Sequence, residues 1–195
     1  MNIDLQEKND IYQMLMDLTC KYNKLEKQME EIIKSGYKKK INVIEWLSYN
    51  VVPNTTFESF INDRNLLVIH NADIEYILDS SFYDTIHPIL SRSLFGLDRI
   101  PVVAYTNTFY GFEGETWIEL SRDNMIKWFN KIYMKFIDAF YLWKKVKILE
   151  AGLKKDACET ACDKAIVKLM NIDFRSESAF SKMKSMLLCG MKKEM

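Results

Sequence analysis

The chain has 195 residues, of which 48% are apolar and 13% aromatic, so it can bury a sizeable core and global disorder is excluded. Only 6 glycines and 3 prolines occur, which favours long regular elements over a loop-rich fold. The 27 basic and 27 acidic side chains balance, and this total does not indicate a strongly basic nucleic-acid-binding protein.

The charge is unevenly distributed along the chain. Residues 48–120 carry 3 basic and 10 acidic side chains, whereas residues 121–147 carry 7 basic and 2 acidic ones. Two explanations stay open. The two segments face each other across the fold and cancel, or the second segment is an exposed basic helix that meets an acidic partner or phosphate.

A seam of apolar residues runs through positions 10–34 at alternating spacings of four and three, without Pro or Gly. This pattern predicts a coiled-coil helix about 36 Å long. With Leu15 at heptad position a, Lys21 falls at g and Glu26 at e, which favours a parallel pair in register. Packing of the seam on the protein's own body is the alternative, and the bulky Tyr22 at a also allows a trimer or heteromer. The predicted seam consists of Ile11, Leu15, Leu18, Tyr22, Leu25, Met29 and Ile32.

Short amphipathic helices are predicted between residues 41 and 96. Pro53 ends the first, and Thr55 with Glu58 forms a capping box for the second. Asn71 is expected to cap a third helix, and Ser81 with Asp84 a fourth. Pro88 lies inside this last pattern, where it should kink the helix or delay its start.

The periodicity then changes to two, in runs rich in β-branched and aromatic residues. These runs predict a three-stranded antiparallel meander with strands at Pro101–Tyr105, Thr108–Phe112 and Thr116–Leu120. We expect its aromatic side chains, Tyr105, Phe109 and Trp117, to seat the sheet on a following helix. The outward strand face and the turn at Glu113, Gly114 and Glu115 are then candidate docking surfaces.

Three helices should complete the chain. Ser121 caps a long helix over residues 122–150, whose wide aromatic face is expected to support the meander. Further helices are predicted from Asp156 to Met170 and from Glu177 to Leu188, the last capped by Ser176. The expected fold class is therefore mainly α with a small three-stranded antiparallel β-meander (α+β), behind an N-terminal coiled-coil helix. Its predicted domains are a coiled-coil oligomerisation helix at 1–36 and a compact helical domain at 37–195, with the meander at about 101–120.

Motifs that carry chemistry are few. No G-x-S-x-G, P-loop or G-x-G-x-x-G occurs, and only His70 and His87 could act as a histidine base. Cys158 and Cys162 lie one helical turn apart, but a structural zinc needs four ligands. We therefore predict no enzyme, no catalytic residue, no metal and no cofactor. We also expect free thiols, no membrane-spanning helix and no secretory signal.

Lysines recur every four residues on the predicted long helix and gather again near the C-terminus. Such stripes can neutralise phosphates or an acidic partner, and they are also the ordinary outer face of an amphipathic helix. Nucleic-acid binding is thus possible but not favoured. The candidate contacts are Lys127, Lys131, Lys135, Lys182 and Lys184.

The order of segments resembles an uncharacterised family of large eukaryotic DNA viruses that includes relatives of mimiviruses and iridoviruses. The resemblance covers about residues 40–188 and rests on "NVIEWLSYN", "TTFESFIN", "IPVVAYTNTFYGFEGETWIELS", "MIKWFNKIYMKFIDAFYLWKK" and "FRSESAFSKMKSML". In some members the module follows a coiled coil attached to a KilA-N-type DNA-binding domain. The matches centre on Thr108-Phe109-Tyr110, Trp117, the helix ending at Trp143, and Phe180–Leu187, and they bring no catalytic residues with them.

Together, the seam and the resemblance lead to two hypotheses of function. The first is a non-enzymatic viral structural or assembly protein that oligomerises as a dimer or trimer and docks onto another viral protein of the capsid or virion interior. The second is a nucleic-acid-associated regulatory protein that uses the lysine face of the 122–150 helix. The resemblance implies a location in the virion or in a viral factory of the host cytoplasm.

Overall fold

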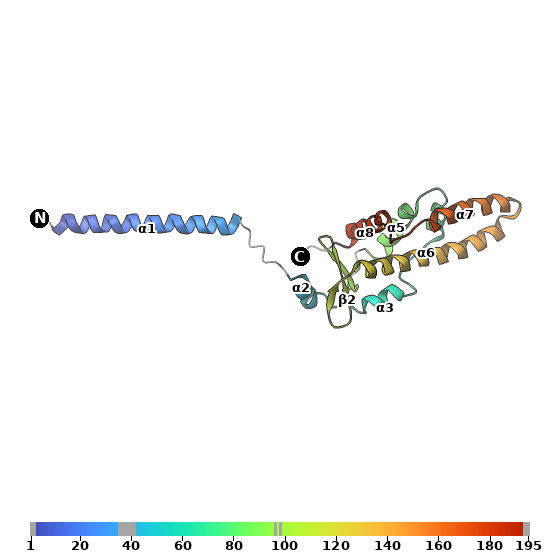
Figure 1. The fold of residues 1–195 in the computed structure, drawn as a ribbon, viewed down its shortest axis with the longest axis horizontal. Helices are drawn as coiled ribbons and strands as arrows, with labels where there is room; N and C mark the ends of the chain where they lie inside the picture. The colour runs from blue at the N-terminus through green and yellow to red at the C-terminus, as the bar shows by residue number, and fades with distance from the viewer. Residues whose placement is uncertain (1–2, 35–41, 96, 98, 193–195) are drawn as a thin grey trace. The chain divides into compact units, whose positions relative to one another are not determined.

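The structure is a computed structural model that describes residues 3–34, 42–95, 97 and 99–192, with the side chains of residues 11–30 described in the first helix. The chain divides into two units between Asn42 and Val43. In the first unit the structure describes one helix, α1 (Ile3–Lys34), shown in blue in Figure 1. The predicted domain boundary at residues 36 and 37 lies outside the described residues.

The second unit, which we call the body, confirms the predicted fold class, because it is mainly helical with one three-stranded antiparallel sheet. The strands β1 (Val102–Tyr105), β2 (Thr108–Phe112) and β3 (Trp117–Glu119) follow one another in sheet order. Val103 pairs with Tyr110, and Phe112 pairs with Trp117. These bounds agree with the prediction to within one residue at each end.

Both faces of the sheet are covered, which differs from the predicted meander with one outward face. Phe109 and Gly111 point to one face, where Phe109 meets Trp128 of α6 (Arg122–Glu150) edge-on at 5.8 Å between ring centroids. Residues that alternate with these point to the other face. There Val103 and Trp117 are buried with Leu47 of α2 (Val43–Asn50).

Trp117 therefore does not seat the sheet on the long helix, as its aromatic character suggested. It lies opposite Phe112 in the register, and directly paired residues share a face. The Trp117 indole N–H donates to the carbonyl of Val51, 3.3 Å away, next to α2. Tyr105 pairs with Thr108, so it lies on the face opposite to that of Phe109, and Phe109 is the predicted anchor that packs on α6.

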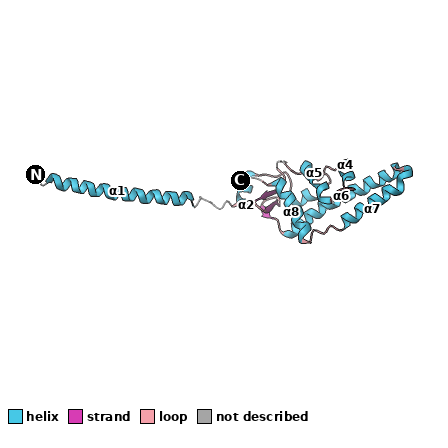
Figure 2. Cartoon of the chain, turned by 90° about the horizontal axis from the view of Figure 1, so that it is seen from above, coloured by secondary structure: helices cyan, strands magenta, loops and turns pink. Residues whose placement is uncertain are grey.

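The helix α6 is the central element of the body. It begins after Ser121, whose hydroxyl accepts the Asn124 backbone N–H, as predicted. Its aromatic face is fully buried at Phe129, Phe136 and Phe140. Figures 1 and 2 show α6 running from the sheet to the far end of the body, where α7 (Lys155–Met170) returns beside it. A short 3-10 turn, η1 (Gly152–Lys154), joins the two helices.

The remaining helices close the core. They are α3 (Phe57–Asn62), α4 (Asn71–Tyr76), α5 (Phe82–Ser93) and α8 (Glu177–Met191), and α5 packs beside α8. Ser81 and Ser176 cap α5 and α8 as predicted, because each hydroxyl accepts a backbone N–H three residues on.

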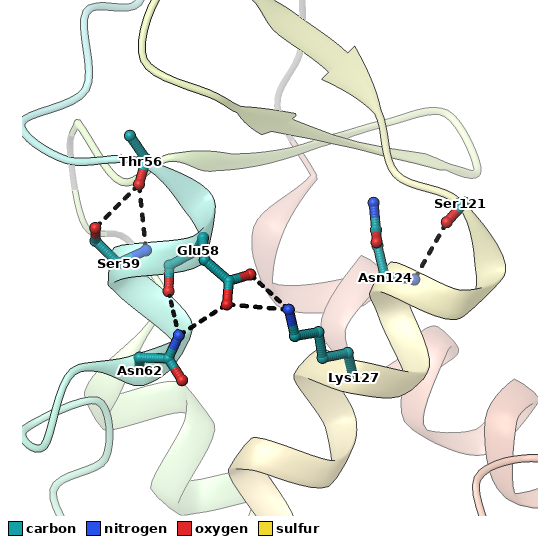
Figure 3. Close-up of polar contacts among 7 residues, drawn as sticks. All are labelled: Thr56, Glu58, Ser59, Asn62, Ser121, Asn124 and Lys127. Atoms are coloured by element: carbon teal, nitrogen blue, oxygen red, sulfur yellow. Dashed lines mark hydrogen bonds and ion pairs between the residues drawn. The ribbon is translucent and has the colours of Figure 1, made fainter.

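Two cap predictions were wrong, and one of two alternatives for Pro88 is excluded. Thr56, not Thr55, caps α3, since its hydroxyl accepts the Ser59 N–H (Figure 3). The N-cap of α4 is His70 rather than Asn71, because the Asp73 carboxylate accepts the His70 backbone N–H and Asn71 is already the first residue of the helix. Of the two alternatives for Pro88, the delayed start is excluded, because α5 begins at Phe82 and includes the proline.

Candidate functional site: an exposed apolar stripe on the first helix

The predicted seam is exposed along the part of α1 whose side chains are described. The exposed fractions of its six members in this part lie between 57% and 70%. Within α1 itself no other side chain covers this stripe, and exposed contiguous apolar surface marks an interaction site. Ile32 lies outside the described side chains. The six members are Ile11, Leu15, Leu18, Tyr22, Leu25 and Met29.

Additional exposed apolar side chains widen this stripe. Tyr12 and Met14 occupy the e and g positions that flank the seam, and both are strongly exposed. Further along the helix, Lys21 at g and Glu26 at e supply the opposite charges that parallel neighbours would exchange. The sequence thus places an apolar surface and a register signal on the same helix.

The lysines of α6 are partly engaged within the body. The Lys127 ammonium pairs with the Glu58 carboxylate of α3 at 2.8 Å, as Figure 3 shows. This hydrogen bond, together with one from Asn62, lowers the pKa of Glu58. Lys147 pairs with Glu75 at 2.7 Å. Two lysines of the basic segment therefore meet carboxylates of the acidic segment, which supports the cancellation explanation.

The remaining candidate lysines are divided between two elements. Lys131 and Lys135 are half-buried on α6, whereas Lys182 and Lys184 belong to α8. The Lys182 ammonium lies 5.5 Å from the centroid of the Tyr83 ring, a cation–π distance. Arg122 of α6 pairs with Glu177 of α8 at 2.8 Å, whereas Lys127 of α6 pairs with Glu58 of α3. The contacts of these lysines thus lie with different neighbours.

The turn at Glu113, Gly114 and Glu115 is exposed, as a docking surface requires. Its backbone is held by a hydrogen bond from the Glu113 N–H to the Thr116 carbonyl at 2.9 Å. Gly114 has a φ of 108°, which a residue with a side chain rarely adopts. Two carboxylates are therefore presented on a fixed turn.

Residues with reactive side chains do not converge in the part of the chain that the structure describes. His70 and His87 are both exposed, and His87 packs its ring edge-on against Phe95. Among the described residues, no group of three or more His, Cys, Asp or Glu is placed to hold a metal ion. Cys158 and Cys162 are close enough for a hydrogen bond, and burial raises the pKa of the Cys162 thiol.

A second apolar stripe escaped the sequence prediction. Leu142, Val146, Leu149 and Leu153 are all exposed on the outer face of α6 and the following turn. Their spacings of four, three and four were a usable signal. The stronger aromatic periodicity of the same helix concealed it, because that periodicity accounts for the buried face.

Comparison with known proteins identifies no relative. No protein family, no curated protein and no solved structure matches the chain. None of the helices that the structure describes is long and apolar enough to cross a membrane.

Proposed function

We propose that this chain is a non-enzymatic viral structural or assembly protein that self-associates through α1 and docks its body onto another viral component. The observation that carries the self-association is the apolar heptad stripe from Ile11 to Met29, whose side chains are exposed on α1. Its heptad spacing and the charges of Lys21 and Glu26 fit a second copy of the same helix in parallel.

The body fits the role of a folded unit that contacts the partner while α1 self-associates. Its core is formed by residues of α2 to α8 and of the sheet. The exposed carboxylates of Glu113 and Glu115 offer a basic partner a charged contact of fixed geometry. The viral setting of the proposal rests on the sequence resemblance described above.

Sedimentation analysis of two matched variants tests the self-association. Leu18→Gln with Leu25→Gln removes two apolar groups from the seam, whereas Cys20→Gln with Lys27→Gln alters the outer f positions of the same heptads. We expect the seam variant to sediment as a monomer at concentrations where the control and the unmodified chain form a dimer or trimer. Identical sedimentation of all three proteins would overturn the proposal.

A nucleic-acid role remains the alternative, and Lys131 and Lys135 are the residues that support it. Neither lysine makes an ion pair among the described residues, in contrast to Lys127. A filter-binding titration across salt concentration tests this role, because phosphate contacts appear first at low salt. Retention of DNA or RNA that weakens in Lys131→Gln with Lys135→Gln would favour the alternative.

A further inference from the structure

The exposed stripe on α6 combines the features of a helix-pairing surface. The exposed fraction is 70% for Leu142, 52% for Val146, 78% for Leu149 and 109% for Leu153. The buried aromatic face of the same helix, at Phe136 and Phe140, points to the core. The stripe is therefore additional apolar surface that the body's own packing does not use.

The surroundings of the stripe set its limits. On one side, α4 and α6 enclose an open hollow of about 370 Å³, whose walls include Ile74, Leu142 and Val146. The rim of this hollow is charged, because the ion pair of Glu75 and Lys147 lies there together with Glu150. An apolar centre with a polar rim is the usual composition of a protein interface.

We propose that the α6 stripe pairs with the same stripe of a second copy of this chain, with the two helices parallel and in register. The residue types carry the choice of partner. Within α6, Val146 occupies heptad position a and Leu142 and Leu149 occupy the flanking d positions, while Leu153 follows in η1 after the helix has ended. A β-branched residue at a with leucine at d favours a two-stranded parallel arrangement.

The flanking charges determine the orientation. Lys145 falls at g and Glu150 at e of the next heptad, so in a parallel pair each lysine faces the partner's glutamate. In an antiparallel pair, g faces g and e faces e, which would bring like charges together. Lys145 makes no ion pair among the described residues, so it is free to make this contact.

The short stripe predicts a weak contact that tethering strengthens. The three a and d layers bury far less than the roughly 800 Å² per partner of a standard stable interface. If α1 holds two chains together, the second contact becomes intramolecular at an effective concentration on the order of millimolar. The pairing of α6 does not need α1, but its strength in the full chain rests on the proposed function.

Sedimentation equilibrium of residues 43–195 tests the pairing without α1. The body contains its own core, so this fragment is expected to fold, and circular dichroism checks this. We expect reversible dimers at protein concentrations up to about 1 mM. Leu142→Gln with Leu149→Gln should abolish them, whereas the control, Met134→Gln with Val167→Gln, replaces exposed apolar residues elsewhere and should not. A body that stays monomeric throughout this range overturns the pairing.

Charge reversal tests the parallel orientation. Lys145→Glu alone and Glu150→Lys alone should each weaken the dimer several-fold, and the double variant should restore it. A double variant as weak as the single ones would overturn the parallel register.

In the full chain, the α6 variant should raise the protein concentration at which the oligomer dissociates. The α1 seam variant should leave the dimers of the body unchanged, so failure of either interface is seen separately.

Discussion

Lys127 of α6 donates hydrogen bonds to both carboxylate oxygens of Glu58 in α3, at 2.8 and 3.0 Å (Figure 3). The Glu58 carboxylate also accepts the side-chain N–H of Asn62 at 3.0 Å, so the pair is oriented from both helices. This pair and the edge-on contact of the buried Phe57 with Trp128 both connect the short helix α3 to α6.

Removing either partner of this pair should have a small effect that depends on pH. A double-mutant cycle of Glu58→Gln and Lys127→Met should give a coupling of about 0.2–1 kcal/mol, since both groups are largely exposed. The pKa of Glu58 is lowered in the folded state. Its contribution is therefore present above the unfolded carboxyl pKa, near 4.3, and is lost as the pH falls through the folded value.

Urea unfolding at pH 7 and at decreasing acidic pH measures this coupling. Lys164→Met serves as the control, because Lys164 is exposed on α7 without an ion pair among the described residues. A coupling that persists unchanged at pH 2 would show that the interaction is not electrostatic.

Replacing Gly111 in β2 should destabilise the body through crowding. An added Cβ would lie 2.6 Å from Leu120 Cδ2 and 3.4 Å from Phe57 Cβ, so a neighbour must shift. We expect Gly111→Ala to cost about 1–3 kcal/mol in denaturant unfolding. In the Leu120→Ala background the same substitution should cost clearly less, because the nearest obstructing atom is gone.

A matched glycine separates crowding from backbone strain. Gly152 has open space around its Cβ position but a φ of 51°. Gly152→Ala should cost about 1–2 kcal/mol through the left-handed backbone, and Leu120→Ala should not relieve it. Equal relief at both glycines would contradict the steric explanation for Gly111.

Truncating the centre of the aromatic core should be far more costly than truncating its surface. Phe136 is fully buried and packs edge-on against Phe82 at 5.7 Å between centroids. Phe136→Ala should lower the free energy of unfolding by about 3–5 kcal/mol. Met134→Ala, at a position that is 50% exposed on the same helix, should stay within about 0.5 kcal/mol. Chemical denaturation followed by tryptophan fluorescence compares the two, and similar losses would place the core elsewhere.

The four cysteines should differ in reactivity. Cys20 and Cys189 are exposed, whereas Cys162 is buried. Desolvation, and to a smaller extent the neighbouring Cys158, raises the pKa of the Cys162 thiol. Because the thiolate is the reactive form, Cys162 should be alkylated slowly at pH 8 and rapidly in urea. Peptide mass spectrometry over time measures the order. Early modification of Cys162 in the folded protein would show that its helix opens readily.

Local signals in the sequence were sufficient for most secondary structure. Alternation predicted all three strands, and hydroxyl side chains predicted the starts of the helices after Ser81, Ser121 and Ser176, because caps and periodicity depend on neighbouring residues only. The heptad spacing of α1 likewise predicted a helix with one apolar side. That the stripe pairs with another copy stays a prediction, since self-association needs a second chain.

Only the tertiary structure decided how these elements use their faces. No local pattern decides on which side of a sheet a tryptophan such as Trp117 packs. The cross-strand register placed it against α2 rather than α6. The ion pair of Lys127 and Glu58 joins residues 69 positions apart, which no local pattern encodes. The outer stripe of α6 became visible only once its buried side was known. The sequence by itself determined which helices and strands form, whereas long-range packing determined which apolar and charged faces remain for partners.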